Sequence, residues 1–149
     1  MKVFIYLLVI YRILFPDAAA TLMFQRPRTI SLLNPIAEEV IESKTQFTDI
    51  RIIRKTLLSD SSYTDKSPIT EMSGFLPDIK IEYKGLNVYI DFIFRTVLFQ
   101  KPTGEYQYLQ LTEEANQKIL GVLIKIFPND EFTRIVYEGN SRRFWFDKE

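Results

Sequence analysis

The chain contains no cysteine and no histidine among its 149 residues. A disulfide framework and a zinc site made of cysteine and histidine are therefore excluded, so an apolar core must hold the fold together. The same absence removes thiol nucleophiles, imidazole bases and Ser-His-Asp triads from the possible chemistry. Carboxylate, lysine, tyrosine and hydroxyl groups remain for catalysis or binding.

The length and composition are typical of one globular domain. A chain of this size buries roughly two-thirds of its extended surface on folding, and 46% of its residues are hydrophobic. Nineteen basic residues balance nineteen acidic ones, so no net charge attracts the chain to nucleic acid or to an anionic membrane. Nucleic acid is thus a disfavoured partner, although a local basic patch is compatible with this balance.

The N-terminal segment has the composition of a secretory signal peptide. Lys2 precedes an apolar run from Val3 to Ile10, and three consecutive alanines end at Ala20. Signal peptidase requires small residues before the bond that it cleaves, so the pattern predicts cleavage after Ala20. It also predicts a mature domain of residues 21–149 in a secreted or periplasmic location. Arg12 is the one departure, because a charge inside the apolar region is costly.

Two other structures compete for the same segment. A buried N-terminal strand is favoured by its Val, Ile, Phe and Tyr content and would place the protein in the cytoplasm. A membrane anchor over residues 3–23 would have to carry Arg12, Pro16 and Asp17. The membrane is a partner only if that anchor is retained.

Beyond this segment the sequence predicts a single α+β domain with two helices. One is expected over residues 35–46, where Asn34 supplies an N-cap and Pro35 suits the first helical position. The other is expected over residues 113–127, because Thr112 supplies a cap and apolar residues recur at helical spacing. Both helices should pack mainly on one face of a sheet.

The remaining segments predict a mostly antiparallel sheet of five to six strands. They show alternating apolar and polar residues or high β-propensity, and turn residues separate them. The expected strands are residues 49–57, 79–83, 88–99, 106–111, 132–137 and 142–146. The first of these is ambiguous, because its three cationic residues suit a helix equally well. Residues 59–74 predict a long loop rich in serine and aspartate.

A first candidate site is acidic. It consists of Glu38 or Glu39, Asp78 in LPDIKIEYKG and Asp91 in NVYIDFIF. This arrangement resembles the restriction-endonuclease-like nuclease superfamily, in which a Pro-Asp pair opens one strand and an acidic residue and a lysine lie on its antiparallel partner. The resemblance implies a magnesium ion held by Glu38, Asp78 and Asp91 in an intracellular nuclease or a degenerate relative. Ile93 occupies the position of the family's lysine.

A second candidate site is a tyrosine-rich sheet face. The period-two alternation of strands places Tyr89, Tyr106 and Tyr108 on one side, together with Arg95. Tyrosine offers a large rigid contact surface and a hydroxyl group, so such faces recur at protein interfaces. The competing interpretation is that a helix covers this face and the tyrosines only reach its edge.

The opposite side of the same strands is expected to be core. Ile90, Phe92 and Phe94 share that side and should face the helix over residues 113–127. Only one face of the sheet is then available to a partner.

A third candidate site is the C-terminal stretch SRRFWFDKE. On a strand, Arg143 and Trp145 would point away from Phe144 and Phe146. Arginine beside an exposed aromatic is typical of protein hot spots and of stacking platforms for single-stranded nucleic acid. The alternative is a last strand that only anchors the sheet.

Taken together, these features lead us to expect a small binding domain without a catalytic centre or a cofactor, whose partner is another protein.

Overall fold

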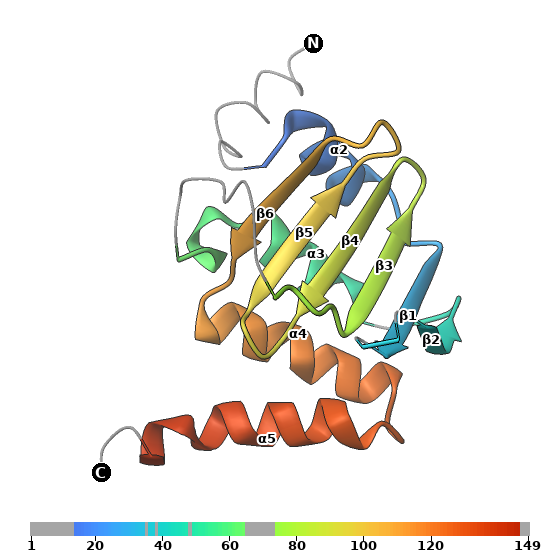
Figure 1. Cartoon of the computed structure of the whole chain (residues 1–149). Helices are drawn as coiled ribbons and strands as arrows, with labels where there is room; N and C mark the ends of the chain where they lie inside the picture. Colours follow the sequence, from blue (N-terminus) through green and yellow to red (C-terminus); the bar gives the residue numbers. More distant parts are fainter. Residues whose placement is uncertain (1–13, 35, 38, 48, 65–73, 147–149) are drawn as a thin grey trace.

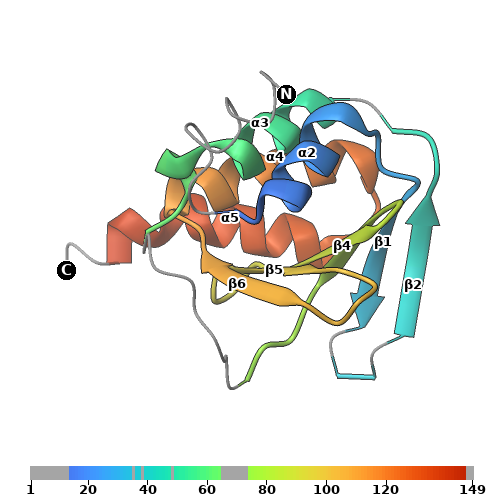
Figure 2. The same ribbon diagram turned by 90° about the horizontal axis from the view of Figure 1, so that it is seen from above.

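The computed structural model describes residues 14–34, 36–37, 39–47, 49–64 and 74–146. These residues form an α+β fold in which helices cover one face of a six-stranded antiparallel sheet (Figure 1, Figure 2). The predicted fold class and the antiparallel sheet are confirmed, whereas the described residues form four helices instead of the two predicted.

The strands are β1 (Thr29–Asn34), β2 (Glu39–Lys44), β3 (Ile79–Tyr83), β4 (Leu86–Asp91), β5 (Thr96–Gln100) and β6 (Tyr106–Gln110). The helices are α2 (Pro16–Phe24), α3 (Ile50–Leu58), α4 (Glu113–Ile126) and α5 (Glu131–Phe146), with a short 3-10 turn, η1 (Asp60–Ser62). The sheet order is β2-β1-β3-β4-β5-β6, and each neighbouring pair is antiparallel.

The core lies between the sheet and the helices α2, α3 and α4. Ile90 and Phe92 are buried on the helix side of the sheet, as predicted. Asn116 of α4 is also buried, and its Nδ2 donates to the carbonyl oxygen of Phe92 at 3.1 Å. Thr112 caps α4 as expected, because its side chain accepts a hydrogen bond from the N–H of Ala115 at 3.1 Å.

The helix predicted over residues 35–46 is wrong, because β1 and β2 form an antiparallel hairpin there with one irregularity in register. Asn34 does accept hydrogen bonds as a cap would. Its Oδ1 receives the N–H groups of Ile36 at 3.1 Å and Ala37 at 3.2 Å, within the turn of the hairpin. Asparagine uses the same side-chain acceptor in Asx turns and in helix N-caps, so this local signal does not distinguish the two.

The strand predicted over residues 49–57 is a helix, α3, which is the alternative that its cationic residues suit. Ile50, Ile53 and Leu57 are buried at helical spacing, whereas Arg51 is exposed. The apolar residues therefore mark one stripe of a helix and not one face of a strand.

The C-terminal hairpin predicted over residues 132–146 is also wrong, because these residues belong to the single helix α5. Asp130 lies just before that helix and accepts from the N–H of Thr133 at 2.8 Å, as an N-cap does. Thr133 is buried, and Val136 and Tyr137 pack against the core at helical spacing. This helical stripe overrides the turn signal of the Gly-Asn pair in the middle of the segment.

The long strand predicted over residues 88–99 is two strands, β4 and β5, joined by a tight turn. Asp91 ends β4, and its Oδ1 accepts from the N–H groups of Ile93 at 3.1 Å and Phe94 at 3.2 Å. Arg95 completes the turn with a φ of 56°. Phe94 lies in this turn and is 55% exposed, so the prediction that it belongs to the core is wrong.

The N-terminal part is described from Leu14 onward, and there it forms α2. Leu14, Ala18, Ala19 and Leu22 are buried in the core. The bond after Ala20, at which the sequence predicts cleavage, lies inside this helix. None of the described helices is both long enough and apolar enough to cross a membrane.

Candidate functional site

The helices leave one face of the sheet open (Figure 2). The pairing register places Tyr89 opposite both Lys80 and Leu98, and Leu98 opposite Tyr108. Side chains that lie directly opposite one another in paired strands share a face. These four residues therefore lie on the side away from the helices, whereas Val88 alternates with them and is fully buried on the helix side.

The three tyrosines that the alternation placed together lie on this open face. Tyr106 is 49% exposed, whereas Tyr89 and Tyr108 are half-buried. The rings of Tyr106 and Tyr108 meet edge to face with their centroids 5.6 Å apart. Partial burial raises the pKa of Tyr108, and the neighbouring Tyr106 adds to the rise. The Tyr108 hydroxyl group therefore remains a hydrogen-bond donor at physiological pH.

The segment before β3 extends this aromatic surface. The ring of Phe75 contacts that of Tyr108 edge to face at 5.3 Å between centroids. A hollow of about 370 Å³, which we call the open-face hollow, lies on the same side of the sheet. Its lining residues are Leu33, Asn34, Val40, Phe75, Pro77, Lys80, Tyr89, Leu98 and Gln100. The Nζ of Lys80 lies 5.8 Å from the centroid of the Tyr89 ring, so a cation and an aromatic face meet at this hollow.

The other three predicted binding residues are placed elsewhere. Arg95 lies in the turn between β4 and β5, and its Nη1 is 3.5 Å from the Oε1 of Glu113. This ion pair holds Arg95 at the start of α4. The predicted position of Arg95 beside the tyrosines assumes one continuous strand, and the turn between β4 and β5 interrupts that alternation. Arg143 and Trp145 belong to α5, so they are not the outward-pointing pair of a last strand.

The acidic residues of the nuclease-like pattern lie at one end of the sheet. Asp78 and Asp91 are 5% and 2% exposed. The Oδ2 of Asp78 accepts from the N–H of Phe92 at 2.9 Å, and the Oδ2 of Asp91 accepts from that of Leu76 at 3.2 Å. Glu38 lies outside the described residues. Within the described ranges, no three acidic side chains gather as the ligands of a metal ion.

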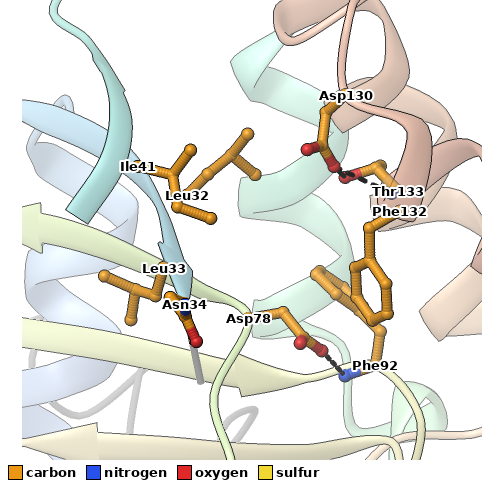
Figure 3. A pocket seen from close by; sticks show the side chains of 9 residues that line it. All are labelled: Leu32, Leu33, Asn34, Ile41, Asp78, Phe92, Asp130, Phe132 and Thr133. Carbon is orange, nitrogen blue, oxygen red and sulfur yellow. Dashed lines mark hydrogen bonds between the residues drawn. The ribbon is translucent and has the colours of Figure 1, made fainter. Parts of the chain in front are cut away.

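Asp78 also lines a second cavity, which the sequence did not predict. This cavity, the Asp78 pocket, has a volume of about 220 Å³ (Figure 3). It lies between the β1–β2 hairpin, the adjoining ends of β3 and β4, and the first turn of α5. Its lining residues are Leu32, Leu33, Asn34, Ile41, Asp78, Phe92, Asp130, Phe132 and Thr133.

The carboxyl group of Asp78 is perturbed by this environment. Burial raises its pKa from 3.8 to about 7, against the lowering effect of the hydrogen bond from Phe92. The negative charges of Asp91 and Asp130 raise it further. A group with such a pKa changes its charge near neutral pH, which an ordinary surface aspartate does not do.

Comparison with known proteins supplies no relative from which a role can be transferred. No family model matches the chain, and neither a curated protein nor a solved structure matches it at a significant level.

Proposed function

We propose that this protein binds another protein through the open, tyrosine-rich face of its sheet. The observation that carries the proposal is the edge-to-face cluster of Phe75, Tyr108 and Tyr106 on the side away from the helices. Aromatic side chains are enriched at protein interfaces because they supply large contact areas at little cost in conformational entropy. The cluster therefore has the composition of a contact surface.

The open-face hollow gives this surface a place for an anchoring side chain of the partner. Its lining combines the rings of Phe75 and Tyr89 with the aliphatic Leu98 and the polar Gln100. Binding energy at protein interfaces is concentrated where an apolar anchor fills such a depression. A partner residue with an apolar body would cover these rings and exclude water from them. The hydroxyl group of Tyr89 and the amide group of Gln100 could then orient that residue through hydrogen bonds.

Lys80 supplies a charge that a partner can use. Within the part of the chain that the structure describes, its Nζ pairs with the half-buried Glu82 at 3.8 Å, and an ion pair near the surface contributes about 0–1 kcal/mol. The lysine can therefore exchange Glu82 for a carboxylate of the partner at little cost. We expect the contact surface of the partner to carry an acidic residue beside its apolar anchor.

Export is a separate proposal, which rests on Lys2, the apolar run from Val3 to Ile10 and the alanines that end at Ala20. It is tested by the intact mass of the protein isolated from its native source. A chain that begins at Thr21 in an extracytoplasmic fraction would support it. A chain that retains Met1 in a soluble cytosolic fraction would contradict it.

The binding face can be tested by photo-cross-linking in the native cell. A photoreactive phenylalanine analogue at position 106 should form a covalent adduct with one protein. A second substitution, Tyr89→Ala, should reduce the adduct, because it removes a wall of the hollow. The matched control carries the analogue at position 114, whose glutamate side chain on α4 is 81% exposed on the helix side of the molecule.

The proposal fails if no adduct forms at position 106. It also fails if the same protein is captured with equal yield at position 114, because contact would then not be specific to the sheet face. Thermal unfolding of each variant, measured in parallel, separates the loss of a contact surface from the loss of the fold.

A further inference from the structure

The Asp78 pocket has the features of a binding site for a cation. We propose that it binds a small organic ammonium ion, with Asp78 as the counter-ion and the apolar side chains around it enclosing the alkyl part. The pocket adjoins the open-face hollow, since Leu33 and Asn34 line both, but Asp78 belongs to the pocket alone. Its test does not depend on the proposed protein partner.

The carboxyl group at the base of the pocket has unused hydrogen-bonding capacity. Asp78 is only 5% exposed, and a carboxylate can accept about four hydrogen bonds. Among the described residues it receives one, from the N–H of Phe92 at 2.9 Å (Figure 3). An ammonium group offers three donors and a positive charge, which are the two things that this carboxylate lacks.

The charges around the pocket favour a cation over an anion. Asp130 is the second acidic residue in the lining, and no lysine or arginine belongs to it. The Oδ2 of Asp130 accepts from the N–H and the hydroxyl group of Thr133, so it caps the first turn of α5. That cap offsets the positive end of the helix dipole, which would otherwise attract an anion. The guanidinium group of Arg134 is directed elsewhere, to the carbonyl oxygen of Pro128 at 3.1 Å.

The walls and the size of the pocket define the rest of the ligand. Leu32 and Phe92 are buried at its base, whereas Ile41 and Phe132 are 62% and 42% exposed at its mouth. An alkyl group seated between them would cover apolar surface that now faces water. The volume of about 220 Å³ is below the range of about 300–1,000 Å³ that accommodates drug-sized ligands. The pocket therefore suits an amine with a short hydrocarbon chain.

Binding should depend on pH, because only the ionised form of Asp78 attracts the ammonium ion. Burial raises the pKa of Asp78 to about 7, and the charged groups that act on it, Asp91 and Asp130, are both acidic. About 1% of such a group is ionised at pH 5, so affinity should be up to about 100-fold lower there than at pH 8. An alkylammonium ion keeps its charge across this range, as lysine does.

The experiment is an NMR titration of the full chain with n-butylammonium and, separately, with its neutral analogue 1-butanol. At pH 8 the amine should bind at least about 10-fold more tightly than the alcohol, since a charge-assisted contact replaces a neutral one. The largest shifts should occur at the amide groups of Phe92 and Thr133, which both donate to pocket carboxylates.

Two variants locate the effect. Asp78→Asn keeps an acceptor for the N–H of Phe92 but removes the charge, so it should abolish the preference for the amine over the alcohol and flatten the pH dependence. Glu114→Gln removes one negative charge from the exposed surface of α4 and should change neither property. The pH dependence of the unmodified protein tests the same idea if Asp78→Asn does not fold.

Several results would overturn the proposal. One is an equal affinity for the amine and the alcohol, and another is a preference for the amine that persists in Asp78→Asn. A third is the absence of saturable shifts at Phe92 and Thr133 at amine concentrations up to about 10 mM.

Discussion

Replacing Asp78 with asparagine isolates the energetic cost of a carboxyl group at the buried end of β3. The two side chains have nearly the same shape, and the asparagine oxygen can still accept the hydrogen bond from the N–H of Phe92. What the substitution removes is the ability to ionise. We therefore expect its effect on stability to depend on pH.

The sign and size follow from the pKa of Asp78, which burial raises from 3.8 to about 7. The folded protein holds this proton more tightly than the unfolded chain does. The stability that the protonated Asp78 carboxyl group contributes is therefore complete below about pH 4, declines as the pH rises, and is lost above about pH 7. At 1.36 kcal/mol per pKa unit, the loss over this window amounts to about 4 kcal/mol. Asparagine does not titrate, so Asp78→Asn should be more stable than the unmodified protein by up to that amount at pH 8 and nearly equal to it at pH 4.

Urea unfolding at the two pH values measures this difference directly, because it gives the free energy of unfolding of each protein. Asp91→Asn is the matched control. Both carboxylate oxygens of Asp91 accept from N–H groups, those of Leu76, Ile93 and Phe94. Its replacement turns one acceptor into a donor and should cost about 1–3 kcal/mol. The reasoning is refuted if Asp78→Asn is the less stable protein at pH 8, or if its advantage is the same at both pH values.

Three further predictions concern stability. Removal of residues 1–20, the cleavage that the export proposal expects, should leave a mature domain whose free energy of unfolding is about 3–5 kcal/mol lower, because Leu14 and two alanines leave the core. Thermal unfolding of the two chains measures this cost, and an unchanged midpoint would contradict it. Phe92→Ala should lower the free energy of unfolding in urea by about 3–5 kcal/mol, whereas Tyr106→Ala on the open face should change it by no more than about 0.5 kcal/mol. Similar costs for the two substitutions would show that both faces of the sheet are core. Thr112→Ala should cost about 0.5–2 kcal/mol by removing the N-cap of α4, and Thr112→Ser should retain most of the stability.

The elements that the sequence predicts correctly are those in which burial and local signals agree. β3 and β6 alternate between buried and open positions along their whole length, and α4 has both a capping residue and an apolar stripe. In such segments a shift of one residue would expose the apolar set, so the register is strongly determined. The positions of Tyr89, Tyr106 and Tyr108 on one face follow from this alternation.

The errors arise where a local signal fits two structures. Asn34 suits a helix N-cap and an Asx turn equally, and only the pairing of β1 with both β2 and β3 decides between them. The Gly-Asn pair near the C-terminus suits a hairpin turn, but packing of Val136 and Tyr137 against the core favours the helix. Both decisions depend on contacts between distant parts of the chain, which neither segment encodes by itself.

The Asp78 pocket could not be predicted for the same reason. Its walls come from the β1–β2 hairpin, from the adjoining start of β3 and end of β4, and from the start of α5. The sequence predicts a helix in place of β2 and a pair of strands in place of α5, so two of these walls are absent from the fold that it predicts. The sequence identifies Asp78 as a candidate acidic residue, but its burial depends on the surrounding segments.

Packing within the fold explains the positions of the tyrosines on the open face, but it does not explain why a carboxylate occupies position 78. Alternation and partial burial account for the positions of the tyrosines, and their rings gain contact area whether or not a partner is bound. At Asp78, an asparagine would keep the hydrogen bond to Phe92 without the cost of burying a charge near neutral pH. Packing alone therefore does not account for a carboxylate there, and perturbed groups of this kind gather at functional sites. A cation bound in the pocket would stabilise the ionised form of Asp78 and so offset the cost of burying that charge.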